Sequence, residues 1–187
     1  MIMDKFILKL DDSLLLIVDI QERLAVAMSE KERVRVVSNT LHLIESAKLL
    51  GVPLLITEQY SKGLGPTVPE VRSAVQTYTP IEKITFSCCG EGFFTEAVEE
   101  TEKKQIILLG METHVCVLQT CIDLLQNEYV VHVVSDAICS RTKQNYKTAI
   151  EYMRDAGAVI TCTETVLFQL LVKAGTEEFK AISKRIK

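Results

Sequence analysis

Residues 105–126, QIILLGMETHVCVLQTCIDLLQ, place a buried strand, a tight turn and an amphipathic helix in direct succession. The apolar run Ile106–Leu109 ends at Gly110 and predicts the strand, and apolar residues at helical spacing over 115–126 predict the helix. Cys116 therefore lies close to a helix N-terminus, where unpaired N–H groups and the helix dipole favour a reactive thiolate. The alternative is that Cys116 is a small buried apolar residue, as most free cysteines are.

The rest of the chain repeats this alternation of strand and helix. Short loops joining alternating strands and helices predict an α/β fold. We expect three α/β/α layers around a doubly wound, mostly parallel sheet of about six strands, in a single domain over residues 1–187. Polar stretches at 58–70, EQYSKGLGPTVPE, and at 135–145, SDAICSRTKQN, predict loops. The other predicted strands are Leu14–Val18, Pro53–Thr57, Ile81–Phe86, Tyr129–Val134 and Ala158–Thr161.

Composition narrows the classes of partner. The 187 residues carry 21 basic and 25 acidic side chains, for a net charge of −4, without a lysine or arginine block. This pattern argues against a nucleic-acid partner. No apolar run is long enough to span a bilayer, and the first residues do not form a signal peptide. Six scattered cysteines without a C-x-x-C pair predict reduced thiols and a cytoplasmic location, with a mitochondrial one left open.

Three residues with chemically useful side chains fall at or near predicted strand ends. They are Asp19, Lys83 and Cys116. In a parallel sheet the functional groups gather at the carboxyl ends of the strands, so a base, a cation and a thiol could share one crevice there. Each also has an ordinary structural interpretation: a helix cap or ion pair for Asp19, an exposed loop residue for Lys83, and a core residue for Cys116.

The stretches around these residues resemble, in the same order, the motifs of isochorismatase-like cysteine hydrolases, which include nicotinamidases and N-carbamoylsarcosine amidohydrolase. The stretches are LLLIVDIQERL around Asp19, IEKITFS around Lys83 and LLGMETHVCVLQT around Cys116. The resemblance runs from about Leu14 to about Leu171. It implies a hydrolase of a small amide- or carbamoyl-type substrate that needs no cofactor.

The resemblance also implies a role for each catalytic residue. Asp19 would take the Cys116 proton, and Lys83 would hold the carboxylate and the thiolate in register. Cys116 would attack a carbonyl carbon and form a thioester-type intermediate, which water then hydrolyses. This agrees with the general need of a thiol for an adjacent base or cation at neutral pH. The backbone N–H groups of Glu112 and Cys116 would bind the oxyanion, next to a non-proline cis peptide between Met111 and Glu112.

The chain departs from the nicotinamidase pattern in the region after the second strand. Nicotinamidases hold a metal there with Asp-x-His and a further histidine, whereas residues 57–71 contain no histidine. The spacing of His42, His114 and His132 fits no metal site, so we expect a metal-independent enzyme. Isochorismatases proper lack the cysteine, so Cys116 argues against that subgroup.

Further candidates concern substrate and assembly. Gln21, Gln59 and Tyr60 could contact the substrate, although each could equally be structural. For His114 a structural role is the favoured interpretation. The short chain is 48% apolar and resembles a family that usually assembles, which predicts a homo-oligomer. Two other functions stay open: a non-catalytic interaction protein that retains the fold, and a thiol redox sensor based on Cys116.

Overall fold

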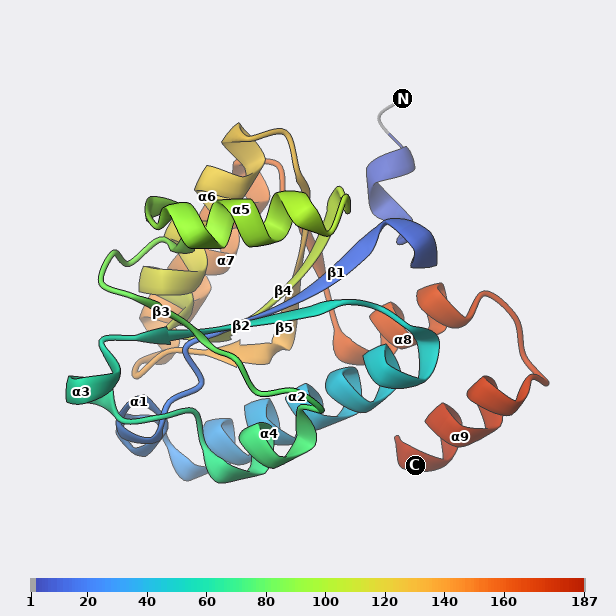
Figure 1. Cartoon of the computed structure of the whole chain (residues 1–187), viewed down its shortest axis with the longest axis horizontal. Helices are drawn as coiled ribbons and strands as arrows, with labels where there is room; N and C mark the ends of the chain where they lie inside the picture. The colour runs from blue at the N-terminus through green and yellow to red at the C-terminus, as the bar shows by residue number, and fades with distance from the viewer. Residues whose placement is uncertain (1–2, 187) are drawn as a thin grey trace.

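A computed structural model describes residues 3–186, which form a parallel six-stranded sheet between two layers of helices (Figure 1). The strand order is β3-β2-β1-β4-β5-β6, and every neighbouring pair runs parallel. The predicted doubly wound α/β fold is therefore confirmed. The strands are β1 (Ser13–Val18), β2 (Leu54–Gln59), β3 (Ile81–Lys83), β4 (Gln105–Met111), β5 (Val130–Cys139) and β6 (Val159–Thr161).

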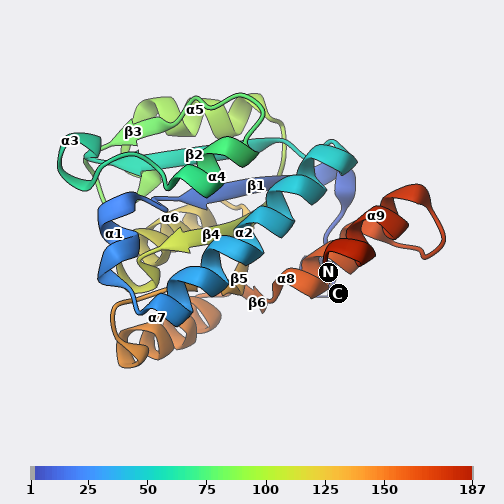
Figure 2. The same cartoon turned by 90° about the horizontal axis from the view of Figure 1, so that it is seen from below.

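The helices cover both faces of the sheet. One layer contains α5 (Gly92–Glu100), α6 (Leu118–Gln126) and α7 (Lys143–Asp155), and the opposite layer is built on α2 (Glu30–Leu50), which crosses the sheet diagonally in Figure 2. The helices α4 (Pro69–Ala74), α8 (Thr163–Leu171) and α9 (Glu177–Arg185) contact α2, and α1 (Glu22–Ala27) and α3 (Ser61–Leu64) are short. Within residues 3–186, no helix combines the length and the apolar character needed to cross a membrane.

Burial explains the central strands, and capping explains the helix ends. All residues of β1 and β4 are buried, as expected for apolar runs covered by helices on both faces. The longest helix, α2, begins with Ser29, whose side chain accepts a hydrogen bond from the Glu32 N–H, and ends at Gly51 with φ of 72°. The predicted N-cap Thr176 accepts from the Phe179 N–H at the start of α9.

The strand β5 is longer than predicted. The sequence predicted a loop from residue 135, but β5 continues to Cys139, which pairs with Met111 of β4. Ser135 and Asp136 interrupt the apolar run, which caused the error. Inside the fold their side chains are satisfied, because Ser135 Oγ donates to the Thr161 carbonyl at 2.7 Å and Asp136 Oδ1 accepts from the Thr163 N–H at 2.8 Å.

Two other predicted boundaries were wrong. The strand predicted over residues 81–86 ends at Lys83, and residues 58–70 include the end of β2, all of α3 and the start of α4. The early end of β3 affects the site directly. The chain curls after Lys83, so that the Thr85 and Phe86 carbonyls accept hydrogen bonds from its ammonium group.

Candidate active site

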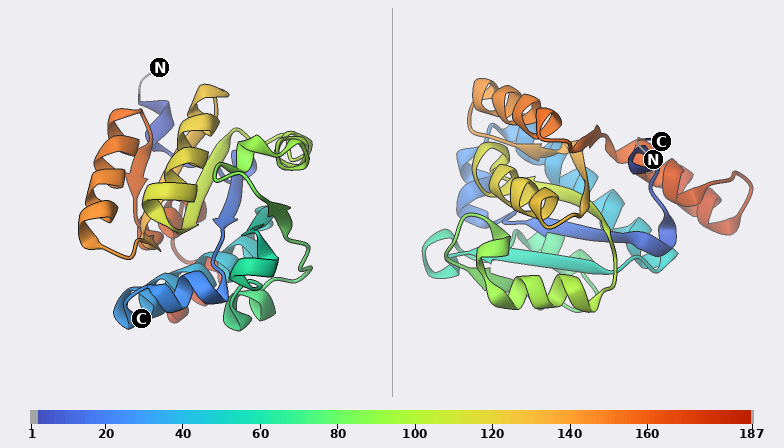
Figure 3. Two further views of the ribbon diagram at one scale, coloured as in Figure 1. Left: turned by 90° about the vertical axis from the view of Figure 1, so that its left-hand side faces the viewer. Right: turned by 90° about the horizontal axis from the view of Figure 1, so that it is seen from above.

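Four neighbouring strands bring the predicted catalytic residues to one edge of the sheet. Asp19 follows β1, Lys83 is the last residue of β3, and Cys116 lies in the first turn after β4. The left panel of Figure 3 views this carboxyl edge. The exposed fractions are 0% for Asp19, 1% for Lys83 and 5% for Cys116, so the three groups share a site almost closed to solvent.

Asp19 and Lys83 form a buried ion pair. Lys83 Nζ lies 2.7 Å from Asp19 Oδ2, and neither side chain is exposed. Burial by itself lowers the pKa of Lys83, but the negative charge of Asp19 acts in the opposite direction, and the net pKa is raised. Lys83 therefore stays an ammonium ion. Asp19 itself has a left-handed backbone with φ of 51°, a conformation that Asp tolerates better than most residues.

The Cys116 thiol is protonated at rest. Burial, followed by the charge of Asp19, raises its pKa well above the ordinary value, and the Lys83 ammonium opposes this only in part. Cys116 lies in a π-helical turn, Thr113–Val117, directly before α6, as the sequence placed it. The expected lowering of its pKa by the helix start was wrong, because desolvation and a carboxylate neighbour dominate. Such a thiol needs a base to become a nucleophile.

The two glutamines hold other groups in place. Gln59 Oε1 accepts from Lys83 Nζ at 2.7 Å, and Gln59 Nε2 donates to the Ile84 carbonyl, which orients the ammonium group. Gln21 is completely buried. Its amide group donates to the Gln59 and Gly65 carbonyls and accepts from the Gln59 N–H at 2.8 Å. With these atoms engaged, the geometry favours a structural role for Gln21.

Tyr60 lies at the rim of this region. Its side chain is 54% exposed, its φ is 39°, and its ring packs against Gly63. Tyr60 is therefore open to solvent, and its contact with a substrate stays a prediction.

The turn that carries Cys116 is tied to the start of α7. The peptide between Met111 and Glu112 is cis, as predicted. The Glu112 carboxylate accepts from Arg141 Nε at 2.7 Å. His114 Nδ1 lies 2.9 Å from Ser140 Oγ, and its Nε2 lies 3.2 Å from the Asn145 amide. These contacts agree with a structural role for His114. The convergence of the Glu112 and Cys116 N–H groups on one oxyanion stays a prediction.

Sequence reasoning missed one residue of this cluster, Thr57. It is completely buried in β2, pairs with Val18, and its Oγ1 donates to Asp19 Oδ1 at 2.7 Å. Cys88 Sγ lies 3.8 Å from the same hydroxyl. The signal was available, because Thr57 ends the predicted second strand and so had to lie near the end of the first.

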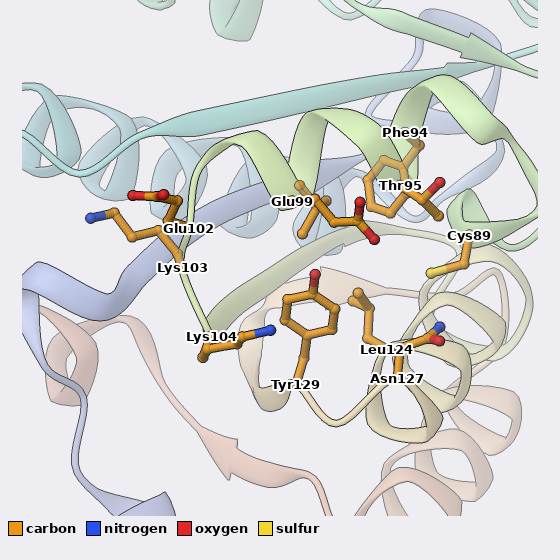
Figure 4. Close-up of a pocket in the computed structure, with 11 residues that line it drawn as sticks. Cys89, Phe94, Thr95, Glu99, Glu102, Lys103, Lys104, Leu124, Asn127 and Tyr129 are labelled. Carbon is orange, nitrogen blue, oxygen red and sulfur yellow. The ribbon is translucent and has the colours of Figure 1, made fainter.

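Two cavities lie outside the cluster. One of about 530 Å³, between the starts of α2 and α7, includes Ser140 and Arg141 in its wall. Another of about 400 Å³ separates α5 from α6, with Lys104 Nζ 4.9 Å from the centre of the Tyr129 ring and Cys89 at its far end (Figure 4). Neither wall includes Asp19, Lys83 or Cys116. No cluster of three or more His, Cys, Asp or Glu side chains suited to a metal occurs among residues 3–186.

Comparison with known proteins identifies the family. The sequence profile of the isochorismatase domain matches residues 13–165. The chain belongs to the isochorismatase family. It is 43% identical over 161 residues to the secreted isochorismatase effector Isc1 of Phytophthora sojae, covering 81% of this chain and 74% of the relative.

Solved structures of the family share the whole fold. A MAR1 ribonuclease from Caenorhabditis elegans superimposes with a TM-score of 0.88 at 35% identity, covering 96% of this chain and 91% of the other. YcaC from Pseudomonas aeruginosa, solved with hexane-2,5-diol and covalent acrylamide, gives 0.88 at 28% identity with coverage of 96% and 91%. YcaC from Escherichia coli, described as an octameric hydrolase of unknown specificity, gives 0.88 at 25% identity with coverage of 96% and 90%.

Proposed function

We propose that this member of the isochorismatase family is a cysteine hydrolase that cleaves the C–N bond of a small amide- or carbamoyl-type compound. The observation that carries the proposal is the buried Asp19–Lys83 ion pair beside the protonated thiol of Cys116. A buried carboxylate next to a buried thiol supplies the base that the thiol lacks. In a merely structural core, two charges and a thiol at the end of a sheet would be costly to retain.

The first half of the reaction forms an acyl-enzyme. Asp19 accepts the proton of Cys116 while the sulfur attacks the substrate carbonyl carbon and forms a C–S bond. The carbonyl electron pair moves onto oxygen, and the N–H groups of Glu112 and Cys116 stabilise the resulting oxyanion. When the carbonyl reforms, the C–N bond breaks, and the departing nitrogen takes the proton from Asp19. A thioester on Cys116 remains.

The second half releases the acid. Asp19 accepts a proton from water while the water oxygen attacks the thioester carbonyl. The tetrahedral intermediate then expels the Cys116 sulfur, which recovers the proton from Asp19. Lys83 remains an ammonium ion throughout, held by Gln59 and two backbone carbonyls, and keeps the Asp19 carboxylate oriented. No step requires a metal or a cofactor, so we expect turnover to survive chelator treatment.

One family member supports part of this proposal, and another supplies the competing substrate class. The covalent acrylamide in Pseudomonas aeruginosa YcaC agrees with a reactive nucleophile in this fold, because acrylamide reacts readily with thiolates. The ribonuclease from Caenorhabditis elegans makes RNA the second substrate class to test. The net charge of −4 and the absence of a basic block in this chain favour the small-molecule substrate.

We also propose that the chain assembles into a homo-oligomer and resides in the cytoplasm, with a mitochondrial location as the alternative. Large apolar side chains stand exposed beside Lys83 and at the start of α5, namely Ile84 at 77%, Phe86 at 55% and Phe93 at 81%. A second copy would remove this apolar surface from water. The octameric YcaC of Escherichia coli supports this expectation. Light scattering at micromolar concentration tests it, and a monomer would contradict it.

A single screen tests the enzymatic proposal. The protein is incubated with amides, carbamoyl compounds, RNA and peroxide, and the intact mass and the products are followed. We expect an acyl adduct on Cys116 and release of acid with one of the first two classes. The Cys116→Ala variant should form no adduct, and Cys121→Ala, which alters a buried thiol on α6, the helix that follows Cys116, should behave as the wild type. RNA cleavage or peroxide oxidation without acyl transfer would overturn the proposal.

A further inference from the structure

A second set of contacts reaches Asp19 through its other carboxylate oxygen. Lys83 pairs with Oδ2, whereas Oδ1 accepts a 2.7 Å hydrogen bond from the hydroxyl of Thr57. Both Thr57 and Asp19 are 0% exposed, so no solvent replaces this contact. A hydrogen bond to a buried charged group is among the stronger ones in proteins.

The direction of each hydrogen bond in this set is defined. A threonine hydroxyl has one proton, and Thr57 gives it to a carboxylate oxygen that has none. The Thr57 oxygen can then accept a proton from Cys88, whose sulfur lies 3.8 Å away. Burial, with a further contribution from Asp19, raises the pKa of Cys88 to about 12, so that this thiol stays a donor at neutral pH. Two donors in series therefore point toward Asp19, which strengthens the bond to the carboxylate.

The same series of hydrogen bonds is anchored to α6, the helix that follows Cys116. The Cys88 N–H donates to Thr120 Oγ1 at 3.0 Å, and Ser87 Oγ donates to Asp123 Oδ2 at 2.5 Å. Thr120 and Asp123 belong to α6, and Thr120 lies four residues, about one helical turn, after Cys116. The thiol and hydroxyl contacts thus link the base at the end of β1 to α6, the helix that directly follows the turn of Cys116.

We propose that Thr57 is a positioning residue for the hydrolysis: its hydroxyl, backed by the Cys88 thiol, holds the Asp19 carboxylate oriented to take the Cys116 proton. The inference rests on the proposed function, since it requires Asp19 to act as the base. The titratable groups that face Asp19 are Lys83 from β3, Cys116 from the nucleophile turn and Cys88 from the turn at 88–90.

The test measures the reaction of Cys116 with acrylamide between pH 4 and 9 and needs no knowledge of the substrate. The sulfur adds to the terminal vinyl carbon of acrylamide, and the proton of the thiol ends on the neighbouring carbon. Peptide mapping by mass spectrometry separates the Cys116 adduct from adducts on other cysteines. On the acid side, we expect the rate to fall where the base that accepts the thiol proton is lost.

Thr57→Val removes the donor and keeps the shape of the side chain. We expect the midpoint of the acid limb to move up by about one to two pH units, as expected for the loss of one hydrogen bond to a charged group. Thr57→Ser keeps the donor and should keep the wild-type midpoint. Cys88→Ala removes the second donor and should move the midpoint in the same direction by a smaller amount.

Each outcome has a defined meaning. A Thr57→Val protein with slower alkylation at every pH but an unchanged midpoint would assign Thr57 to packing alone and overturn the inference. If circular dichroism shows that Thr57→Val does not fold, Cys88→Ala tests the inference instead. An upward shift of its acid-limb midpoint supports the inference, and an unchanged midpoint overturns it. Asp19→Asn separates the two proposals. If the Asp19→Asn variant keeps the acid limb of the pH profile, the proposed function fails. If Asp19→Asn loses the acid limb and Thr57→Val keeps the wild-type profile, only the present inference fails.

Discussion

The carboxylate of Glu112 lies 2.7 Å from Nε of Arg141, and this ion pair joins the turn of Cys116 to the residues that precede α7. The Glu112 side chain is 9% exposed, whereas that of Arg141 is 59% exposed. The pair is therefore asymmetric, with a nearly buried carboxylate held by a cation that solvent can reach.

Removing the Arg141 cation should lower the free energy of unfolding by more than the loss of a surface ion pair normally does. Arg141→Gln leaves the Glu112 carboxylate without a charged partner, and we expect a loss of about 1–3 kcal/mol in the free energy of unfolding. Urea denaturation measures this loss. A double-mutant cycle with Glu112→Gln should show a clear coupling, while the exposed pair Glu177 and Lys180 should show a coupling close to zero. Equal couplings in the two cycles would contradict the expectation.

The close approach of β1 and β4 predicts a strict need for glycine at position 110. A Cβ on Gly110 would lie 2.0 Å from the Val18 carbonyl oxygen, and φ is 141°. We expect Gly110→Ala to lower stability by about 4 kcal/mol or to prevent folding. Gly92→Ala is the matched control, because a Cβ there meets nothing within 4 Å and the residue begins α5. If the Gly110→Ala protein folds and is as stable as the Gly92→Ala protein, the predicted need for glycine at position 110 is wrong.

The three catalytic groups should behave as one unit. We expect Cys116→Ala, Asp19→Asn and Lys83→Ala each to lower kcat by about 10³ or more on the substrate that the screen identifies, and each double variant to cost little beyond either single one. Each step needs all three groups, so losing a second group removes little that remains. Losses that multiply across the double variants would show that the residues act independently.

Stability should fall in mild acid because of His132. Burial lowers its pKa to about 4, and its side chain is 1% exposed. Between pH 6.5 and 4 the unfolded chain binds a proton that the folded chain refuses, so the free energy of unfolding decreases as pH falls through this window. The full effect is about 3 kcal/mol. Urea midpoints at pH 7 and 4.5 should differ less in His132→Leu than in the wild type, and equal differences would exclude this cause.

The sequence predicted well wherever one local pattern decided the structure. The apolar runs of β1 and β4, the helix after Cys116 and the parallel α/β class of the fold follow from periodicity and alternation. The length of β5 could not be predicted from a local pattern, because the hydrogen bonds that satisfy Ser135 and Asp136 come from distant parts of the chain. The prediction of a lowered pKa for Cys116 was wrong for a related reason. The helix start is a local feature, whereas burial and the approach of Asp19 depend on the complete fold.

The placement of the three proposed catalytic groups at the ends of three different strands gives the site a property that no segment of the chain has alone. Asp19, Lys83 and Cys116 meet only when β3, β2, β1 and β4 stand in their final order. Any opening that detaches one of these strands disassembles the site, even if the remaining structure survives. Reactivity of Cys116 is therefore a direct reporter of the integrity of four of the six strands, and fragments that end before β4 are silent regardless of how well they fold.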